Sequence, residues 1–195
     1  MLTSQRNNVS VPTFPVEHAV RHICAQHRNL ARVFRAMESH LSAALTKKTR
    51  PDFVLIDCML HYVGAFTGRM HHPSEEKYLF SAMIRAGAPA DVMEKVGEAH
   101  WVGANKLADL RRAFDEWRSH PAMPDPMFLT LAPEYLAFEF DHMYYEESVI
   151  LPCAIEILPA SDWPKIAQAF LGHEDPLFGS APAAALLPLH QYLQS

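Results

Sequence analysis

The chain has 195 residues, enough for one domain with a sizeable core, and its 49% hydrophobic and 20% charged residues argue against disorder or a fibrous repeat. Its net charge of -5, with histidine counted as neutral, offers no basic surface for phosphates and argues against nucleic-acid binding. Its twelve histidines are more than such a composition would lead one to expect.

Two segments in the first half carry apolar residues at helical spacing. The first, residues 16–45, has His27 in the middle of its apolar stripe. The second begins near Pro51, a residue suited to the first position of a helix, and runs through Tyr78 with His71 and Glu75 on its stripe. Both predicted helices therefore direct metal-binding side chains toward a core.

Two further segments repeat this pattern in the second half. The third begins near Ala90, ends before the proline-rich stretch 120–126, and has His100 on its apolar side. The fourth, residues 126–158, has His142 and Glu146 on one face, as the second helix has its own histidine and glutamate. The sequence thus predicts four long helices, each with a histidine on the buried side.

The C-terminal part is shorter and less regular. A short fifth helix is expected after Ser161, a good N-cap residue, and the chain from Gly172 onward is expected to be mostly irregular. We therefore predict an all-α protein in three parts: an N-terminal extension (1–15), a four-helix bundle with the short extra helix (16–172), and a tail packing on the bundle (173–195).

The cysteines and the apolar runs indicate a compartment. Cys24, Cys58 and Cys153 lie far apart without CxxC spacing, which argues against a disulfide framework or a thiolate zinc site. The polar start of the chain lacks the apolar stretch of a secretory signal, and no apolar run approaches the ~20 residues that span a bilayer. We expect a cytoplasmic protein that does not enter membranes.

The histidines and glutamates form pairs suited to metal binding. Residues four apart in a helix lie one turn apart on the same face, where both can reach one ion. About one HxxxE pair is expected by chance, but the chain has three: His71/Glu75, His72/Glu76 and His142/Glu146. Any single histidine here is more readily explained as a core residue bonded to a backbone carbonyl.

The convergence of several such residues is harder to explain without a metal. Buried imidazoles and carboxylates are costly unless they are hydrogen-bonded, paired or bound to a cation. Nitrogen and oxygen ligands without thiolate suit iron, manganese or zinc, and two carboxylates able to bridge favour a pair of ions. The predicted core therefore contains a two-metal site.

The choice between two neighbouring pairs stays open at this level. Helical phase favours His71 and Glu75 over His72 and Glu76, but Pro73 can distort this helix and weaken the phase argument. The remaining histidines are interpreted as structural or surface residues; these are His18, His22, His40, His61, His120, His173 and His190.

Several of these stretches resemble one known family, the bacterial hemerythrin-like proteins with the HHE cation-binding domain. The matching stretches are QHRNL at 26–30, PDFVLIDCMLHYVGAFTGRMHHPSEEKYLF at 51–80, EAHWVGANKLADL at 98–110, FDHMYYEESVILPCAIEILPASDWPKIAQAF at 140–170 and DPLFG at 175–179. HHPxEE followed by LF, and HMxxEE followed by an apolar residue and proline, are specific in combination. The resemblance implies an up-down four-helix bundle with a non-haem, carboxylate-bridged di-iron site, for which zinc or manganese are substitutes.

Transferred residue by residue, the resemblance implies the same ligands that helical phase selects, namely His27, His71, Glu75, His100, His142 and Glu146. Oxygen carriers of this family usually have a further histidine where this chain has Ala104, and an aspartate where it has Glu146. This difference argues against reversible oxygen carriage. The set of four histidines and two glutamates is similar to that of di-iron proteins linked to nitric oxide stress.

The leading functional hypothesis is a protein that binds or senses O₂, NO or peroxide in oxidative or nitrosative stress, rather than a classical enzyme. Two alternatives stay open: a di-iron oxidase or peroxidase, and an iron-buffering or metal-handling module. In the oxidase or peroxidase, Tyr135 is the candidate catalytic residue because it lies two turns before His142 on the same face. A core tyrosine with a bonded hydroxyl is the competing interpretation. A homodimer is left open.

Overall fold

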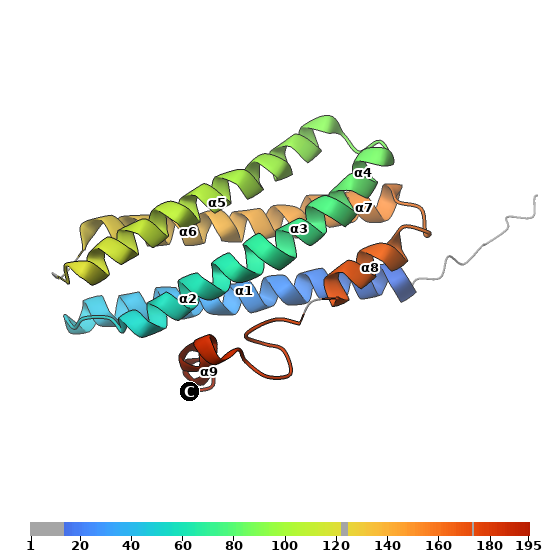
Figure 1. Ribbon diagram of the computed structural model, residues 1–195. Coiled ribbons are helices and arrows are strands. Elements are labelled where there is room, and N and C mark those ends of the chain that lie inside the picture. The colour runs from blue at the N-terminus through green and yellow to red at the C-terminus, as the bar shows by residue number, and fades with distance from the viewer. Residues whose placement is uncertain (1–13, 122–124, 173) are drawn as a thin grey trace, which may run out of the picture.

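The computed structural model describes residues 14–121, 125–172 and 174–195. Four long helical rods run alternately up and down and enclose one interior, as Figure 1 shows, and the described residues contain no strand. The predicted all-α, up-down four-helix bundle is confirmed. None of the helices formed by the described residues has both the length and the apolar character that a membrane span requires.

The first and third rods are single α-helices, whereas the second and fourth contain π-helical turns. The first rod is α1 (Phe14–Lys47) and the third is α5 (Ala90–Ser119). The second rod comprises α2 (Phe53–Phe66), η1 (Thr67–His71), α3 (His72–Ser74), η2 (Glu75–Phe80) and α4 (Ser81–Arg85). The fourth comprises α6 (Pro126–Tyr145), η3 (Glu146–Ile150) and α7 (Leu151–Ile157).

Aspartates cap the start of both interrupted rods. The Asp52 carboxylate accepts hydrogen bonds from the amides of Val54 and Leu55, and Asp125 accepts one from Phe128. The second rod therefore begins at Phe53. Pro51 was expected at the first position of the helix, but it lies outside the helix.

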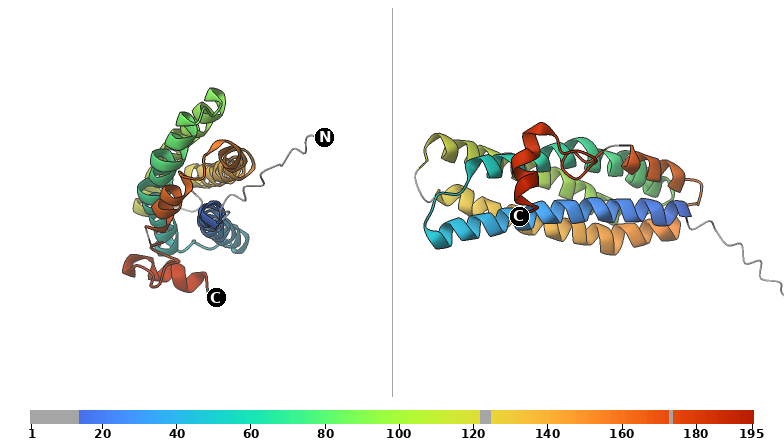
Figure 2. Two further views of the ribbon diagram at one scale, coloured as in Figure 1. Left: turned by 90° about the vertical axis from the view of Figure 1, so that its right-hand side faces the viewer. Right: turned by 90° about the horizontal axis from the view of Figure 1, so that it is seen from below.

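The end of the chain covers the outside of the bundle. α8 (Trp163–Leu171) packs along α1, and it begins after Asp162 instead of being capped by Ser161 as expected. The tail forms η4 (Ala184–Leu186) and α9 (Leu187–Tyr192), which lies against α2 (Figures 1 and 2), while residues 174–183 are irregular, in keeping with the mostly irregular chain expected from Gly172 onward. Leu177, Leu186 and Leu189 anchor this tail in the core.

The core consists of two apolar clusters separated by a polar layer. One cluster fills the half of the bundle that includes Phe34, Phe66 and Phe114, and the other lies around Ile23 and Trp163. On the first three rods, the predicted histidine lies between the two clusters in sequence, as His27 lies between Ile23 and Leu30; on the fourth rod Glu146 does, between Met143 and Ile150. The polar layer therefore lies between two apolar regions of the bundle.

Candidate metal centre

The π-turns of the second and fourth rods coincide with the predicted site residues. The amide of His72 donates to the carbonyl of Thr67, five residues earlier, and Pro73 follows. In the fourth rod the amide of Leu151 donates to the carbonyl of Glu146, and Pro152 follows. Proline has no amide hydrogen and its ring clashes with the carbonyl four residues before it, so a wider turn ahead of each proline relieves that clash.

All six predicted ligands point into the polar layer and are buried. None of them exposes more than 6% of its surface. We call His27 and His71 the first side of the site, and His100 and His142 the second side. The structure brings together His27 from α1, His71 from η1, Glu75 from η2, His100 from α5, His142 from α6 and Glu146 from η3.

The Glu75 carboxylate lies between the two sides. Its Oε1 atom is 3.4 Å from His71 Nε2 and 4.0 Å from His27 Nε2. Its Oε2 atom is 3.5 Å from His100 Nε2 on the second side. One oxygen of Glu75 therefore faces each side.

The Glu146 carboxylate, from the fourth rod, also lies between the two sides. Its Oε2 atom is 3.3 Å from His27 Nε2. Its Oε1 atom is 3.3 Å from His100 Nε2 and 3.4 Å from His142 Nε2. The two glutamates together thus present a pair of oxygens to each pair of imidazoles.

These spacings fit donor atoms around a cation. With metal–ligand bonds of about 2.1 Å, neighbouring donor atoms are about 3.0 Å apart in an octahedron and about 3.4 Å apart in a tetrahedron. The Nε2 atoms of His27 and His71 are 3.1 Å apart. Both ring nitrogens of the buried His142 have no hydrogen-bond partner among the described residues, which is costly unless a cation compensates it. The donor set therefore fits bound metal.

Three of the four imidazoles are oriented by a partner on their outer nitrogen. His27 Nδ1 is 3.0 Å from Glu147 Oε1, His71 Nδ1 is 2.8 Å from Gln26 Oε1, and His100 Nδ1 is 2.9 Å from Glu76 Oε1. Because these oxygens only accept, each Nδ1 carries the hydrogen and each Nε2 presents a lone pair to the interior when the ring is neutral. His142 has no such partner among the described residues.

In the metal-free protein, the charge of the site depends on which imidazoles and carboxylates carry protons. Burial lowers the pKa of His27, but hydrogen bonds to Glu146 and Glu147 raise it overall to about 10. Burial and the charge of Glu146 raise the pKa of Glu75. For Glu146, hydrogen bonds from His100 and His27 outweigh burial and lower its pKa well below the usual range. Without cations, protons on the imidazoles balance the Glu146 charge.

The structure places His72 at the site as well as His71. The Glu75 carboxylate is in the core, whereas the Glu76 side chain is 57% exposed and contacts His100 from outside. The geometry therefore favours the pair His71 and Glu75, which helical phase preferred. His72 is half-buried, and its donor atom lies within 4.8 Å of those of His100 and His142.

Glu139, which the sequence reasoning missed, is a further buried carboxylate on α6. It is 3% exposed and accepts a hydrogen bond from the hydroxyl of Tyr135, the catalytic candidate. Burial raises the pKa of Glu139 to about 7. A Cβ atom at Gly103 on α5 would lie 2.9 Å from Glu139 Oε1, so this glycine provides the room. The available signal was spacing, since Glu139 lies four residues after Tyr135 and three before His142.

The remaining histidines lie outside this cluster. His18 and His22 contact one another on α1, and His40 Nε2 accepts a hydrogen bond from the Asp52 amide. His61 and His120 are exposed and His190 is half-buried. His173 lies outside the described residues.

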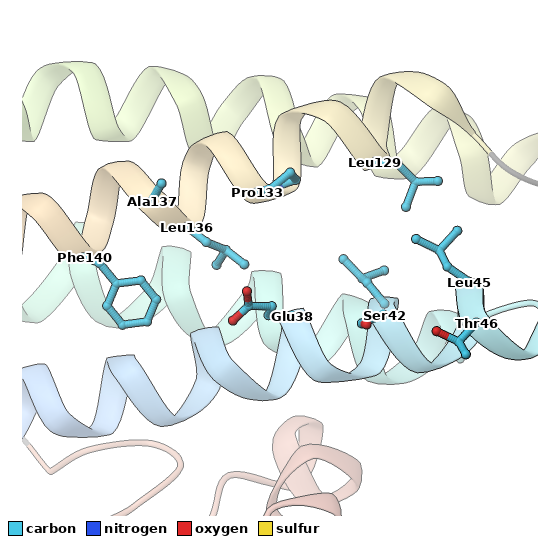
Figure 3. A pocket seen from close by; sticks show the side chains of 10 residues that line it. Glu38, Ser42, Leu45, Thr46, Leu129, Pro133, Leu136, Ala137 and Phe140 are labelled. Atoms are coloured by element: carbon cyan, nitrogen blue, oxygen red, sulfur yellow. The ribbon is translucent and has the colours of Figure 1, made fainter.

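Two surface cavities are each lined by one predicted ligand of the polar layer, and a third is lined by none. A cavity of about 530 Å³ between α1 and α6 is lined by His27, and one of about 390 Å³ between α5 and α6 is lined by His142. The third, of about 490 Å³, is the apolar groove of Figure 3. Its lining on α1 starts at Glu38, eleven residues beyond His27 and thus ~16 Å along the helix, and it includes none of the six predicted ligands.

Comparison with known proteins identifies the domain. The family model described as "Hemerythrin HHE cation binding domain" matches residues 18–154, which include all six predicted ligands. No curated protein and no solved structure matches the chain.

Proposed function

Because the chain belongs to the hemerythrin HHE cation-binding family, whose domain binds metal cations, we propose that it holds two iron ions in its core and binds O₂, NO or peroxide there. The observation that carries this proposal is the position of the two carboxylates. Glu75 and Glu146 each present one oxygen to the first side and one to the second. Such an arrangement suits carboxylates that bridge two ions.

The donor chemistry supports iron over metals that prefer sulfur. The six residues offer imidazole nitrogen and carboxylate oxygen, and the three cysteines of the chain do not belong to the candidate metal groups. Each side offers two imidazole nitrogens and two carboxylate oxygens, fewer than the six donors of an octahedral ion. Iron held in this way supplies redox chemistry and open coordination positions for a small ligand.

The surrounding residues shape an apolar environment for that ligand. Phe66 stacks on His71, Phe80 lies 5.4 Å from His100 between ring centroids, and Phe138 stacks along His142. These rings fix the imidazoles and limit the entry of water. The cavities at His27 and His142 provide routes for small molecules from the surface.

The test is anaerobic loading with ferrous iron, elemental analysis, and titration with NO and O₂ followed by visible spectroscopy. We expect two irons per chain and new absorption bands with at least one ligand. Glu146→Gln should lose iron, whereas the exposed control Glu156→Gln should keep it. Unchanged spectra with both gases would contradict ligand binding, and weak, readily exchanged iron would support the buffering alternative.

The oxidase or peroxidase alternative depends on Tyr135. Its hydroxyl donates to Glu139, and burial raises its pKa well above the usual value, so the phenol keeps its proton. This favours a structural role within the bundle. Turnover of peroxide with a reducing co-substrate that slows in Tyr135→Phe would support the enzyme; a change in stability alone would support the structural role.

A further inference from the structure

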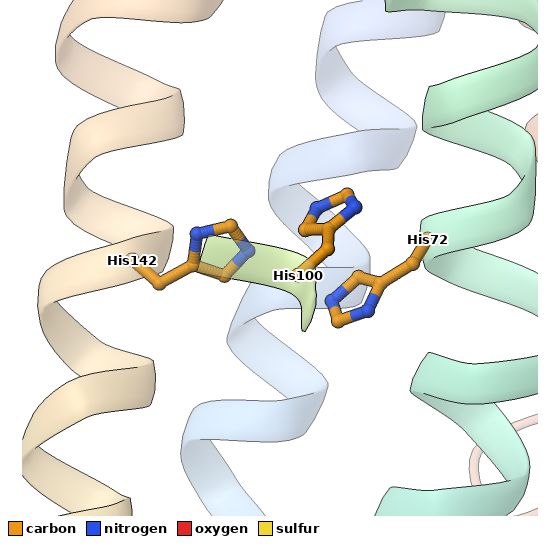
Figure 4. Close-up of side chains that lie close together, drawn as sticks. All are labelled: His72, His100 and His142. Carbon is orange, nitrogen blue, oxygen red and sulfur yellow. The ribbon is translucent and has the colours of Figure 1, made fainter. Parts of the chain in front are cut away.

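A third imidazole lies on the second side of the site. His72 joins His100 and His142 in a cluster whose donor atoms all lie within 4.8 Å of one another (Figure 4). The ring centroids of His72 and His100 are 3.9 Å apart, and those of His72 and His142 are 5.6 Å apart. These three residues come from the second, third and fourth rods.

The π-turn explains how consecutive residues serve opposite sides. His71 ends η1 with its Nε2 atom next to His27 on the first side, and His72 begins α3 with its ring against His100. In a regular α-helix, neighbouring side chains diverge by about 100°. The wider turn ahead of Pro73 brings both rings toward the polar layer.

His72 also differs from the other imidazoles in its hydrogen bonding. The outer nitrogens of His27, His71 and His100 each have an oxygen partner. The His72 ring has contacts with other rings but no hydrogen bond to any described residue. A half-buried imidazole with both nitrogens unused, beside two candidate ligands, is available to a cation.

We propose that His72 is the third imidazole ligand of the cation on the second side. This inference rests on the proposed function, since it requires a cation between His100 and His142. An ion lies near the plane of each imidazole that binds it, whereas the planes of His72 and His100 are nearly parallel, at 12°. The His72 ring therefore turns about its side-chain bonds when the cation binds.

The consequence is that the two cation positions are unequal. The second side has three imidazoles and two carboxylate oxygens, whereas the first side has two imidazoles and two carboxylate oxygens. The first side keeps more open positions, so a small ligand binds there. The cavity lined by His27 is then its entry route.

His72→Phe tests the proposal because it retains a ring that can stack on His100 and removes both nitrogens. The matched control is His61→Phe, an exposed histidine on the same rod. Cobalt(II) serves as the probe, with chelator competition for the affinity of each equivalent. Proton NMR in water counts the shifted N–H signals of the bound imidazoles.

We expect the wild-type protein and His61→Phe to bind two cobalt ions and show five shifted imidazole N–H signals. His72→Phe should show four and bind one equivalent at least about tenfold more weakly, with the other unchanged. His72→Gln provides a second variant in case the phenylalanine perturbs folding.

Several outcomes overturn the inference. Identical affinities and signal counts in His72→Phe and the wild type would do so while leaving the two-metal function intact. Equal weakening of both equivalents would show that His72 supports the fold and is not a ligand of one cation. A wild-type protein that binds no cobalt, iron or zinc would overturn the proposed function itself.

Discussion

At the residue scale, three of the candidate imidazole ligands are held by hydrogen bonds to side chains outside the polar layer. Glu147, Gln26 and Glu76 contact the Nδ1 atoms of His27, His71 and His100 from outside the core. Each immediately precedes or follows a candidate ligand in sequence. Outer partners of this kind fix the ring orientation and raise the basicity of the inner nitrogen.

Glu147→Gln should therefore weaken metal binding with little effect on stability. Its side chain is 43% exposed, so the loss of its charge costs the fold little, but the hydrogen bond to His27 becomes weaker. We expect a loss of cation affinity of about tenfold or more, measured by chelator competition. The exposed Glu156→Gln provides the control, and equal affinities in the two variants would show that Glu147 does not support His27.

Glu139 gives the metal-free protein a pH dependence. Burial raises its pKa from 4.5 to about 7, so its contribution to stability is fully present below about pH 4.5 and is lost as pH rises toward 7. This shift corresponds to about 3 kcal/mol as an upper value. Glu139→Gln should therefore gain stability relative to the wild type between pH 4.5 and 8, measured by urea unfolding of metal-free protein. A constant difference across this range would show that Glu139 does not titrate in the fold.

At the element scale, the interrupted rods are the feature that serves the site. Both π-turns that precede a proline, at η1 and η3, carry or adjoin candidate ligands. A proline inside a helix costs stability, and a wide turn changes the direction of the following side chains. The second rod thus differs from a regular helix where His71, His72 and Glu75 must face the core.

Pro73→Ala should raise the stability of the metal-free protein and lower its affinity for cations. Alanine restores the missing amide and favours a regular α-helix, so the melting temperature of the metal-free protein should rise. The regular helix turns the histidines and Glu75 away from their present directions, so cation affinity should fall. Pro164→Ala, near the start of α8, is the control because proline is tolerated there. Unchanged cation affinity in Pro73→Ala would show that the π-turn is not needed for binding.

The third rod contains a matched pair of glycines. A Cβ atom at Gly103 would meet Glu139 Oε1 at 2.9 Å and Phe138 Cε1 at 3.1 Å, whereas nothing lies within 4 Å of one at Gly97. Gly103→Ala should destabilise the protein by about 1–3 kcal/mol through overpacking. Gly97→Ala should stabilise it by about 0.5–1 kcal/mol, since alanine favours the helix. Thermal unfolding compares the two, and equal effects would show that α5 moves freely away from α6.

At the scale of the whole molecule, the polar layer joins all four rods. Two apolar clusters stabilise the ends of the bundle, and the candidate ligands lie between them. A cation bound only by the folded protein stabilises it by mass action. The metal-bound protein should therefore have a higher free energy of unfolding than the metal-free protein.

The stabilisation of the protein by bound metal should increase with pH. The pKa of His27 and of His100 is raised from 6.5 to about 10, in each case because hydrogen bonds to carboxylates outweigh burial. Their contribution to the metal-free fold is fully present below about pH 6.5 and is lost as pH rises to about 10. A cation must displace these protons, so its affinity rises over the same range. The melting-temperature increase on adding manganese should be larger at pH 8.5 than at pH 6.5; a smaller increase would contradict this charge balance.

Much of this organisation could be read from the sequence because helical phase is local. Apolar residues at spacings of three and four determine the four rods, and the same spacing puts His27, His71, His100 and His142 on their inner faces. The assignment of these residues as metal ligands stays a prediction, as does the division at residues 15 and 172. The family match over residues 18–154 supports the bundle and its cation-binding character.

Only the tertiary structure could decide what the rods do to one another. Glu139 is polar and reads as a surface residue until Gly103 on another rod is seen to make room for it. His72 is off the predicted stripe, and only the π-turn and the approach of α5 bring it to His100. Phase along one helix follows from its own sequence, whereas contacts between helices depend on their rotation, their wide turns and the small residues where they meet.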